Sequence, residues 1–158
     1  MIGCMSEHEV LSWARYGEAA RELTRRLRDT GFTPDVVLGV ARGGMVLAAS
    51  LAYGLGCKNL FSVNVEFYTG EGTTLDAPVM LPPLLDPADL LDMRVLVVDD
   101  VADSGKTLEL VLGLCHGHVA QLRSAVLYQK PTSLLDADVV WQHTDRWIDF
   151  PWSTPDPG

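Results

Sequence analysis

The hydrophobic positions of this chain form short aliphatic runs that alternate with segments of helical spacing. Runs rich in β-branched residues predict strands buried on both faces, as in the interior of a parallel sheet. The expected strands are Glu9–Ser12, Asp35–Val40, Asn59–Phe67, Val95–Val98, Arg123–Tyr128 and Val139–Gln142. Apolar residues three and four apart predict the helices, one capped by Ser12 and ending near Gly31, then Met45–Tyr53 and Thr107–Gly117. This alternation of strands and helices predicts an α/β fold with a parallel sheet.

One long segment, from Thr69 to about Asp92, interrupts the alternation. It is rich in glycine, proline and acidic residues and shows no convincing periodicity. Its prolines exclude long regular structure, although a turn of helix can start at Pro87. An insert of this length in a compact domain is usually a functional lid or a disordered segment. We therefore expect an irregular lid loop here.

The chain is organised around Arg94–Thr107, where an aliphatic strand runs into acidic residues and a glycine turn. The strand is expected to end at Asp99 and Asp100, and the turn Asp103–Thr107 leads into a helix. A helix N-terminus preceded by small residues presents free backbone N–H groups and a positive dipole end, which suit a phosphate. Two carboxylates beside it suit sugar hydroxyls or a hydrated Mg²⁺. Since ligands bind at the carboxyl ends of strands in such sheets, we expect a phosphate site here.

Two other interpretations of this segment are weaker. A Walker A loop needs a glycine five residues before Gly105, where this chain has Asp100. The segment could instead be an ordinary strand–turn–helix with a solvated acidic tip. Three carboxylates, a glycine and two hydroxyls close together argue against that interpretation.

A second strand end carries a similar glycine turn. The strand at Asp35–Val40 runs into Ala41, Arg42, Gly43 and Gly44, and then into an apolar helix. Arg42 supplies a bidentate guanidinium fork where a second phosphate group can bind. The alternative is that the two glycines merely permit close packing of helix and strand, and the spacing does not match the dinucleotide-binding pattern Gly-x-Gly-x-x-Gly. Two anion-binding turns suit a substrate with phosphates at both ends.

Three stretches give the chain a family resemblance. Val97-Val-Asp-Asp-Val-Ala-Asp-Ser-Gly-Lys-Thr107 resembles the phosphoribosyl pyrophosphate (PRPP) motif of type I phosphoribosyltransferases, and Val40-Ala-Arg-Gly-Gly44 resembles their pyrophosphate loop. Asp145-Arg-Trp-Ile-Asp-Phe-Pro-Trp152 is similar to the end of bacterial xanthine–guanine phosphoribosyltransferases. The resemblance implies one phosphoribosyltransferase domain over residues 1–158. It also implies a doubly wound, mostly parallel sheet with a small hood or lid region at about residues 68–92.

The resemblance further implies roles for individual residues. It places PRPP on Asp99, Asp100, Asp103, Ser104, Gly105, Lys106 and Thr107, with Asp103 as the acid–base residue and Asp100 as a ligand of Mg²⁺. It places pyrophosphate on Ala41, Arg42 and Gly43, and the base in the region of about 130–152, on Lys130, Trp147, Ile148 and Asp149. Tyr68 corresponds to the tyrosine of the lid loop. Without the resemblance, Lys130 could be a solvated lysine and Trp147 a packing residue.

The activity that the resemblance implies is transfer of 5-phosphoribose from PRPP to a 6-oxopurine (xanthine, guanine or hypoxanthine) in purine salvage. A lysine can donate to the oxygen at position 6, and a flat ring can stack on an aromatic side chain. Two alternatives stay open. One is a regulatory protein of the same fold that binds PRPP or nucleotides without transfer, and the other is a phosphoribosyltransferase for a different base. Family members commonly form dimers or tetramers, which implies a homo-oligomer.

Composition narrows the choice of partners. The chain has 158 residues, a one-domain length, and 47% of them are hydrophobic, as in a globular protein. A net charge of −9 argues against a nucleic-acid partner, because proteins that bind nucleic acids have a basic surface. We find no apolar run of membrane-spanning length and expect no signal peptide. The three cysteines are odd in number and lack metal-site spacing, so we expect reduced thiols in the cytoplasm.

Three further features are interpreted without a ligand. Residues 1–9 are expected to be a loose leader. The arginines of the first helix are expected to face solvent, because Glu22 stands four residues before Arg26 and can pair with it. His116 and His118 have no third ligand nearby, which favours surface histidines over a metal site.

Overall fold

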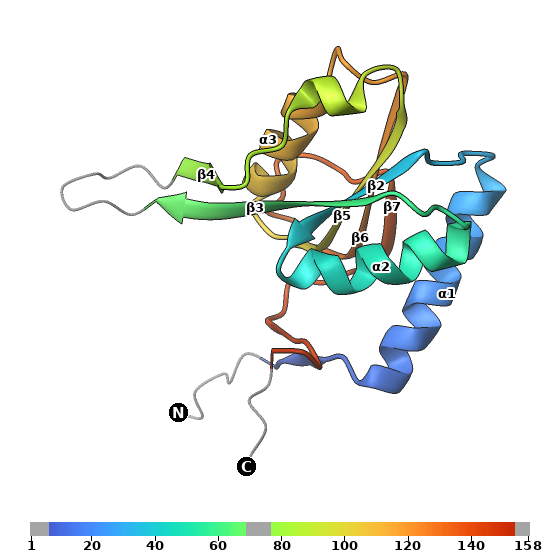
Figure 1. Ribbon diagram of the computed structural model, residues 1–158. Helices are drawn as coiled ribbons and strands as arrows, with labels where there is room; N and C mark the ends of the chain where they lie inside the picture. The colour runs from blue at the N-terminus through green and yellow to red at the C-terminus, as the bar shows by residue number, and fades with distance from the viewer. Residues whose placement is uncertain (1–6, 69–76, 154–158) are drawn as a thin grey trace.

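The computed structural model describes residues 7–68 and 77–153, which form an α/β structure with helices on both faces of a sheet (Figure 1). The six-stranded sheet has the order β4-β3-β2-β5-β6-β7, and every neighbouring pair except β3–β4 is parallel. Its strands are β2 (Val36–Ala41), β3 (Leu60–Tyr68), β4 (Ala77–Leu81), β5 (Arg94–Ala102), β6 (Gln121–Gln129) and β7 (Val139–His143). A separate parallel pair joins β1 (Glu9–Val10) to β8 (Ile148–Asp149).

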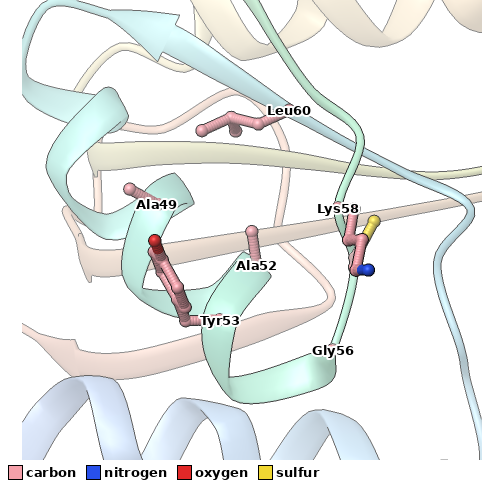
Figure 2. A pocket seen from close by; sticks show the side chains of 7 residues that line it. Ala49, Ala52, Tyr53, Gly56, Lys58 and Leu60 are labelled. Carbon is pink, nitrogen blue, oxygen red and sulfur yellow. The ribbon is translucent and has the colours of Figure 1, made fainter.

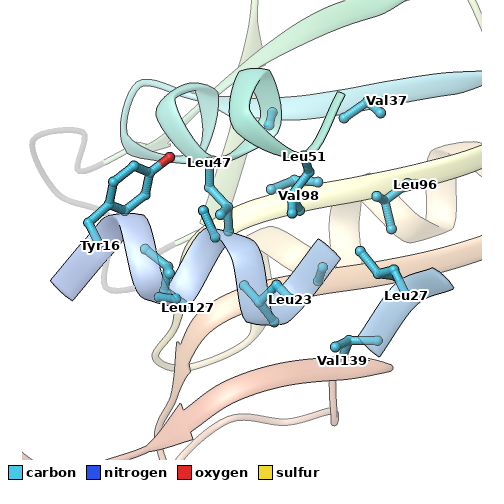
Figure 3. Close-up of a cluster of buried hydrophobic side chains, with 14 of the residues drawn as sticks. Tyr16, Leu23, Leu27, Val37, Leu47, Leu51, Leu96, Val98, Leu127 and Val139 are labelled. Carbon is cyan, nitrogen blue, oxygen red and sulfur yellow. The ribbon is translucent and has the colours of Figure 1, made fainter. Parts of the chain in front are cut away.

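The helices cover the sheet from two sides, as the doubly wound fold predicts. Helices α1 (Trp13–Asp29) and α2 (Gly43–Leu55) pack on one face, and α3 (Lys106–Cys115) and the 3₁₀ turn η1 (Pro87–Leu90) pack on the other. Successive residues of β5 alternate between the two cores. Leu96 and Val98 pack with α1 and α2 (Figure 3), whereas Val95 and Val97 pack with α3. Among the described residues, no helix has the length and hydrophobicity needed to cross a membrane.

The predicted local signals fix the ends of the helices. Ser12 caps α1, because its Oγ accepts a hydrogen bond from the backbone N–H of Arg15 at 3.1 Å. Gly31 follows this helix with a φ of +76°, and Gly56 ends α2 with a φ of +69°. Both glycines take the left-handed conformation that commonly ends a helix. The turn of helix predicted at Pro87 is confirmed as η1.

The sequence interpretation missed one strand of the sheet. Residues 77–81 form β4, so the expectation of an irregular segment between 69 and 92 is wrong for this part. β4 pairs antiparallel with β3 at the edge of the sheet, where Pro78 is tolerated because an edge strand leaves one side of its backbone unpaired. Residues 69–76 of the predicted lid lie outside the described residues.

The central strand is also longer than expected. β5 continues to Ala102 instead of ending at Asp99 and Asp100, because its pairing with β6 extends to the partners Ala102 and Gln129. The acidic residues therefore belong to the strand and alternate between its two sides.

The amino-terminal segment is fixed to the carboxy-terminal one. The backbone N–H of Glu9 donates to the carbonyl of Trp147 (2.7 Å), and that of Leu11 donates to the carbonyl of Asp149 (3.0 Å). The predicted strand at Glu9 thus exists, but it belongs to the β1–β8 pair. The expectation of a loose leader is wrong for residues 7–9, and residues 1–6 lie outside the described residues.

An ion pair joins the amino ends of the two central strands. The carboxylate of Asp35, directly before β2, accepts three hydrogen bonds from Arg94. The donors are the backbone N–H (2.8 Å), Nε (3.1 Å) and Nη2 (2.9 Å) of Arg94. These side-chain and backbone hydrogen bonds lower the pKa of Asp35 from 3.8 to about 2. Since the folded-state pKa lies below the ordinary one, the pair stabilises the fold above about pH 4, and this contribution is lost as the pH falls toward 2.

We expect Asp35→Asn to lower the midpoint of thermal unfolding at pH 7, because an amide cannot make the ionic hydrogen bonds to Arg94. The difference from the unaltered protein should shrink between about pH 4 and 2, where Asp35 becomes protonated. Circular dichroism during heating measures both effects. Asp29→Asn, which removes the exposed helical pair with Arg25, is the control and should change the midpoint less. A difference that stays constant over this pH range would contradict the assignment.

Candidate active site

Two glycine turns meet at the carboxyl edge of the central sheet. β2 and β5 are parallel neighbours, so the turn after β2 lies beside the end of β5. A Cβ added at Gly43 would lie 1.9 Å from Oδ2 of Asp100, and one added at Gly44 would lie 2.8 Å from the carbonyl oxygen of Val98. Only glycine permits this approach. The two glycines therefore do permit close packing of helix and strand. This close packing also brings the turn that carries Arg42 against the acidic strand.

The two acidic residues lie at the first glycine turn, and one of them also reaches the second turn. Asp100 lies against Gly43, whereas Asp99 lines a cavity of ≈190 Å³ together with the second turn. This cavity is lined by Phe67, Asp99, Val101, Ala102, Asp103, Ser104, Gly105, Thr107 and Leu108. A Cβ added at Gly44 would lie 3.1 Å from Oδ1 of Asp99, so both carboxylates lie close to the first turn and Asp99 also borders the second. The site extends across the end of β5.

Burial governs the ionisation of this pair. Asp99 is 8% exposed, and its Oδ1 accepts a hydrogen bond from the backbone N–H of Asp100 at 2.8 Å. Loss of hydration, and secondly the neighbouring Asp100, raise the pKa of Asp99 well above its ordinary value. Burial also raises the pKa of Asp100. A nearby cation would stabilise the charged form of these buried carboxylates.

The donor set fits Mg²⁺. Mg²⁺ in proteins is usually held by one or two carboxylates together with water and substrate phosphates, and not by a complete protein cage. The described residues contain no cluster of three or more carboxylate, histidine or cysteine side chains that could form such a cage. A buried acidic pair at the mouth of two anion-binding turns matches the first arrangement. Asp100, beside the turn of Arg42, is the residue that could contact both the ion and a phosphate group.

The second turn has the geometry of a phosphate site. Gly105 adopts a φ of +80°, and α3 begins at Lys106 directly after it. The Oγ of Ser104 accepts a hydrogen bond from the backbone N–H of Lys106 at 3.3 Å, which leaves its own hydrogen available to a ligand. Thr107 lines the cavity, whereas Lys106 lies outside its lining. The N-terminus of α3, with its positive dipole end, therefore suits an anion.

A third loop, which the sequence interpretation did not assign, covers this turn. The N–H of Leu134 donates to the carbonyl of Ser104 (2.8 Å), and Oγ1 of Thr132 donates to the carbonyl of Asp103 (3.0 Å). A Cβ at Gly105 would lie 2.6 Å from Oγ of Ser133, so this position also requires glycine. The only sequence signal for this loop is a cluster of turn residues after β6. Its contacts fix the shape of the phosphate turn.

Lys130 connects the turn to the carboxy-terminal segment. Its Nζ lies 3.5 Å from Oδ2 of Asp103 and 5.7 Å from the centre of the Trp147 ring. The side chain of Lys130 is 15% exposed, whereas Trp147 is 62% exposed and leaves a ring face open to a ligand. The interpretation of Lys130 as a solvated lysine is therefore wrong. Asp103, Lys130 and Trp147, which were predicted from distant parts of the sequence, thus lie close together.

The strand β8 presents backbone groups as well as side chains. The carbonyls of Trp147, directly before β8, and of Asp149 accept hydrogen bonds from the N–H groups of Glu9 and Leu11. In a parallel ladder, alternate residues direct their N–H and C=O groups to the same neighbour, so those of Ile148 point away from β1. The Ile148 side chain is 7% exposed and anchors the strand in the core. Oδ2 of Asp149 lies within hydrogen-bond distance of Nδ1 of His8, at 2.8 Å.

The remaining predicted residues lie at the edges of the site. Arg42 is exposed at the start of α2, and the peptide bond between Ala41 and Arg42 is cis. Tyr68 ends β3, but its side chain lies outside the described part of the chain. Phe67, its neighbour, lines the cavity of the phosphate turn, which the sequence interpretation did not predict. No local pattern distinguishes Phe67 from the other apolar residues of its strand.

A larger cavity lies elsewhere and has a different character. Its volume is ≈510 Å³, and it lies where α2 ends and β3 begins, at the opposite edge of the sheet from the glycine turns (Figure 2). Ala49, Ala52, Tyr53, Gly56, Cys57, Lys58 and Leu60 line it. This set has one cation and no carboxylate, so it lacks the convergent polar groups of a phosphate or metal site. The smaller cavity is the better candidate.

Comparison with known proteins agrees with this geometry. The chain matches the family Phosphoribosyl transferase domain over residues 6–157. It is 32% identical over 149 residues to a xanthine-guanine phosphoribosyltransferase of Gluconobacter oxydans (strain 621H), covering 93% of this chain and 85% of that protein. A xanthine-guanine phosphoribosyltransferase of Ruegeria sp. (strain TM1040) is 33% identical, with 90% of this chain and 83% of that protein covered.

Solved structures give the same result. A purine phosphoribosyltransferase from Pyrococcus horikoshii Ot3 is 36% identical, with a TM-score of 0.81 over 94% of this chain and 96% of that chain. The Helicobacter pylori Xanthine-Guanine-Hypoxanthine Phosphoribosyltransferase is 28% identical, with a TM-score of 0.77 over 92% of this chain and 94% of that chain. The match over nearly the whole sequence and the two glycine turns at one sheet edge lead to the same conclusion. This chain belongs to the phosphoribosyltransferase family.

Proposed function

We propose that this protein transfers 5-phosphoribose from PRPP to N9 of a 6-oxopurine and releases pyrophosphate, a reaction of purine salvage. The observation that best supports it is the position of Lys130, between Asp103 of the phosphate turn and the open ring of Trp147. A purine stacked on Trp147 would lie beside the turn that holds the ribose phosphate. The relatives described above are named for xanthine, guanine and hypoxanthine, which all carry an oxygen at position 6.

The phosphates of PRPP bind at the two glycine turns. The backbone N–H groups of the turn at Gly105, with the hydroxyls of Ser104 and Thr107, hold the 5′-phosphate. Arg42 and the amides beside it bind the pyrophosphate group, because a guanidinium matches two phosphate oxygens at once. This assignment uses both turns for one substrate. It requires a ligand with phosphates at each end.

The acidic pair lies between these turns and binds the sugar. Asp99 and Asp100 accept hydrogen bonds from the 2′- and 3′-hydroxyls of the ribose, and Asp100 is also placed to hold Mg²⁺. Mg²⁺ bound there with pyrophosphate would neutralise the charge on the leaving group. The burial that raises the pKa of both carboxyl groups strengthens their interaction with a bound cation.

The base pocket selects a purine by its edge and its face. Nζ of Lys130 donates to the oxygen at position 6, and the ring of Trp147 stacks on the base. The N–H and C=O of Ile148, directed away from β1, form hydrogen bonds with the ring edge. Asp149 lies near position 2.

Asp103 moves the proton. The bond from C1′ to pyrophosphate breaks, and the lone pair of N9 forms the new bond to C1′. The base gains positive charge in this step, and Asp103 takes the proton from N7. Lys130 and Thr132 hold the carboxylate of Asp103, at 3.5 Å from Nζ and 3.4 Å from Oγ1, in reach of a base stacked on Trp147.

One assay tests the proposed reaction. Purified protein is incubated with PRPP, Mg²⁺ and one base at a time (xanthine, guanine, hypoxanthine, adenine or uracil), and nucleotides are separated by chromatography. We expect product from the 6-oxopurines alone. Product from adenine or uracil would contradict the base assignment. Binding of PRPP without any product would instead favour the regulatory alternative.

We expect Asp103→Asn to lower kcat by about 10²–10⁴-fold, the contribution of a positioned acid–base group, with the KM for PRPP nearly unchanged. Steady-state kinetics with guanine measures both constants. Glu109→Gln, an equal change of charge at an exposed position of α3, is the control and should leave both unchanged. An unaltered kcat in the Asp103 variant would remove this residue from the proton transfer.

We expect Gly43→Ala to reduce kcat/KM for PRPP by roughly 100-fold, because the added Cβ collides with Asp100 and moves the pyrophosphate turn. Gly113→Ala is the matched control, since a Cβ there meets no atom within 4 Å. That control should keep full activity. Normal PRPP kinetics in the Gly43 variant would show that the turn does not bind the substrate.

We also propose that the protein forms a dimer or tetramer and acts in the cytoplasm. The oligomer follows from the family, and light scattering coupled to size-exclusion chromatography measures it. The location agrees with the free thiols of Cys57 and Cys115 in the described residues. Cys4 lies outside them.

A further inference from the structure

The amino-terminal segment places a histidine on the proposed base pocket. Nδ1 of His8 lies 2.8 Å from Oδ2 of Asp149, and the two side chains are 49% and 34% exposed. An ionised carboxylate can only accept hydrogen bonds, so the imidazole N–H is the donor. This contact occupies one of the two carboxylate oxygens. The sequence interpretation assigned no role to His8.

Trp147, directly before β8, and Asp149 both join the ladder with the amino-terminal segment, because their carbonyls accept hydrogen bonds from the N–H groups of Glu9 and Leu11. Side chains two residues apart on a strand share a face, and Ile148 between them points into the core. Trp147 is the residue on which the base is proposed to stack. The carboxylate of Asp149 therefore lies along the edge of a base stacked there.

Other charged groups near this edge have different partners. Nη2 of Arg146 lies 3.0 Å from Oε2 of Glu7, and Nζ of Lys130 lies 3.5 Å from Oδ2 of Asp103. Among the described residues, His8 is the donor whose contact with the Asp149 side chain is observed. The hydrogen bonding of the Asp149 carboxylate thus depends on His8, a residue of the amino-terminal segment.

The three 6-oxopurines differ at position 2, which faces this carboxylate. Guanine has an amino group there that donates, hypoxanthine has only hydrogen, and xanthine has an oxygen that accepts. A free carboxylate attracts the amino group and repels the oxygen. A carboxylate whose negative charge is offset by an N–H donor repels the oxygen less.

We propose that His8 is a specificity-determining residue that allows the site to accept a purine with oxygen at position 2. By donating to Oδ2 of Asp149, it lowers the repulsion between this carboxylate and the oxygen of xanthine. His8 acts through Asp149 and is a positioning residue. This inference rests on the proposed purine transfer and on the position of the base over Trp147.

Base selectivity in the unaltered protein and four variants tests the inference. We expect His8→Ala to lower the ratio of kcat/KM for xanthine to that for guanine by about three- to tenfold, a modest change because both side chains are partly exposed to solvent. The ratio for hypoxanthine to guanine should change less than about twofold, since hypoxanthine has no acceptor at position 2. Asp149→Asn removes the charge, so adding His8→Ala to it should not change the xanthine ratio further. Glu7→Gln, which breaks the neighbouring pair with Arg146, is the control and should leave the ratio unchanged.

A purely structural role for His8 predicts a different result. An equal fall of kcat/KM for all three bases in His8→Ala would overturn the inference, and so would a fall confined to guanine. Binding of the xanthine and guanine nucleoside monophosphates, measured by calorimetry, gives the same ratio without turnover. If the unaltered protein transfers to no base, the proposed function fails, yet a shifted binding ratio in His8→Ala would still support the role of His8.

Discussion

The parallel pairing of β2 with β5 controls where the candidate site can form. Because the two strands run side by side in the same direction, the turns that follow them open at one edge of the sheet. The turn at Gly43 then approaches so closely that a single Cβ would collide with the carboxylate of Asp100. A substrate with a phosphate at each end can be held only if both turns stay at this spacing. The ion pair between Asp35 and Arg94 fixes the opposite ends of the same two strands.

Burial of an acidic pair at this junction has an energetic cost. Asp99 and Asp100 lose hydration at the end of a strand, and the raised pKa of each carboxyl group shows that the charged form is disfavoured. A cation and a sugar bound in the site would relieve this cost. Buried groups whose charged form is disfavoured in this way often mark functional sites.

The proposed base pocket depends on parts of the chain that are far apart in sequence. The loop after β6 fixes the phosphate turn through Leu134 and Thr132, and Lys130 at its start reaches both Asp103 and Trp147. Trp147 lies directly before β8, which carries Asp149 and pairs with β1. An aromatic group supports this end, since the rings of Phe150 and Trp152 stack at 4.9 Å and Trp152 also contacts Tyr16 of α1. Trp152 is therefore a packing residue of this aromatic group.

The sequence by itself determined the α/β fold, the two glycine turns and the order of the central elements, because these depend on local signals. β-branched runs, the Ser12 cap and the glycine at position 105 each act within a few residues. Tertiary structure alone decided the rest. The pairing of β4 with β3, the extension of β5 to Ala102 and the contact of His8 with Asp149 each require a partner that only the folded chain supplies. A hydrogen bond between residues at opposite ends of the sequence leaves no periodic pattern in either segment, and for this reason it became visible only in the structure.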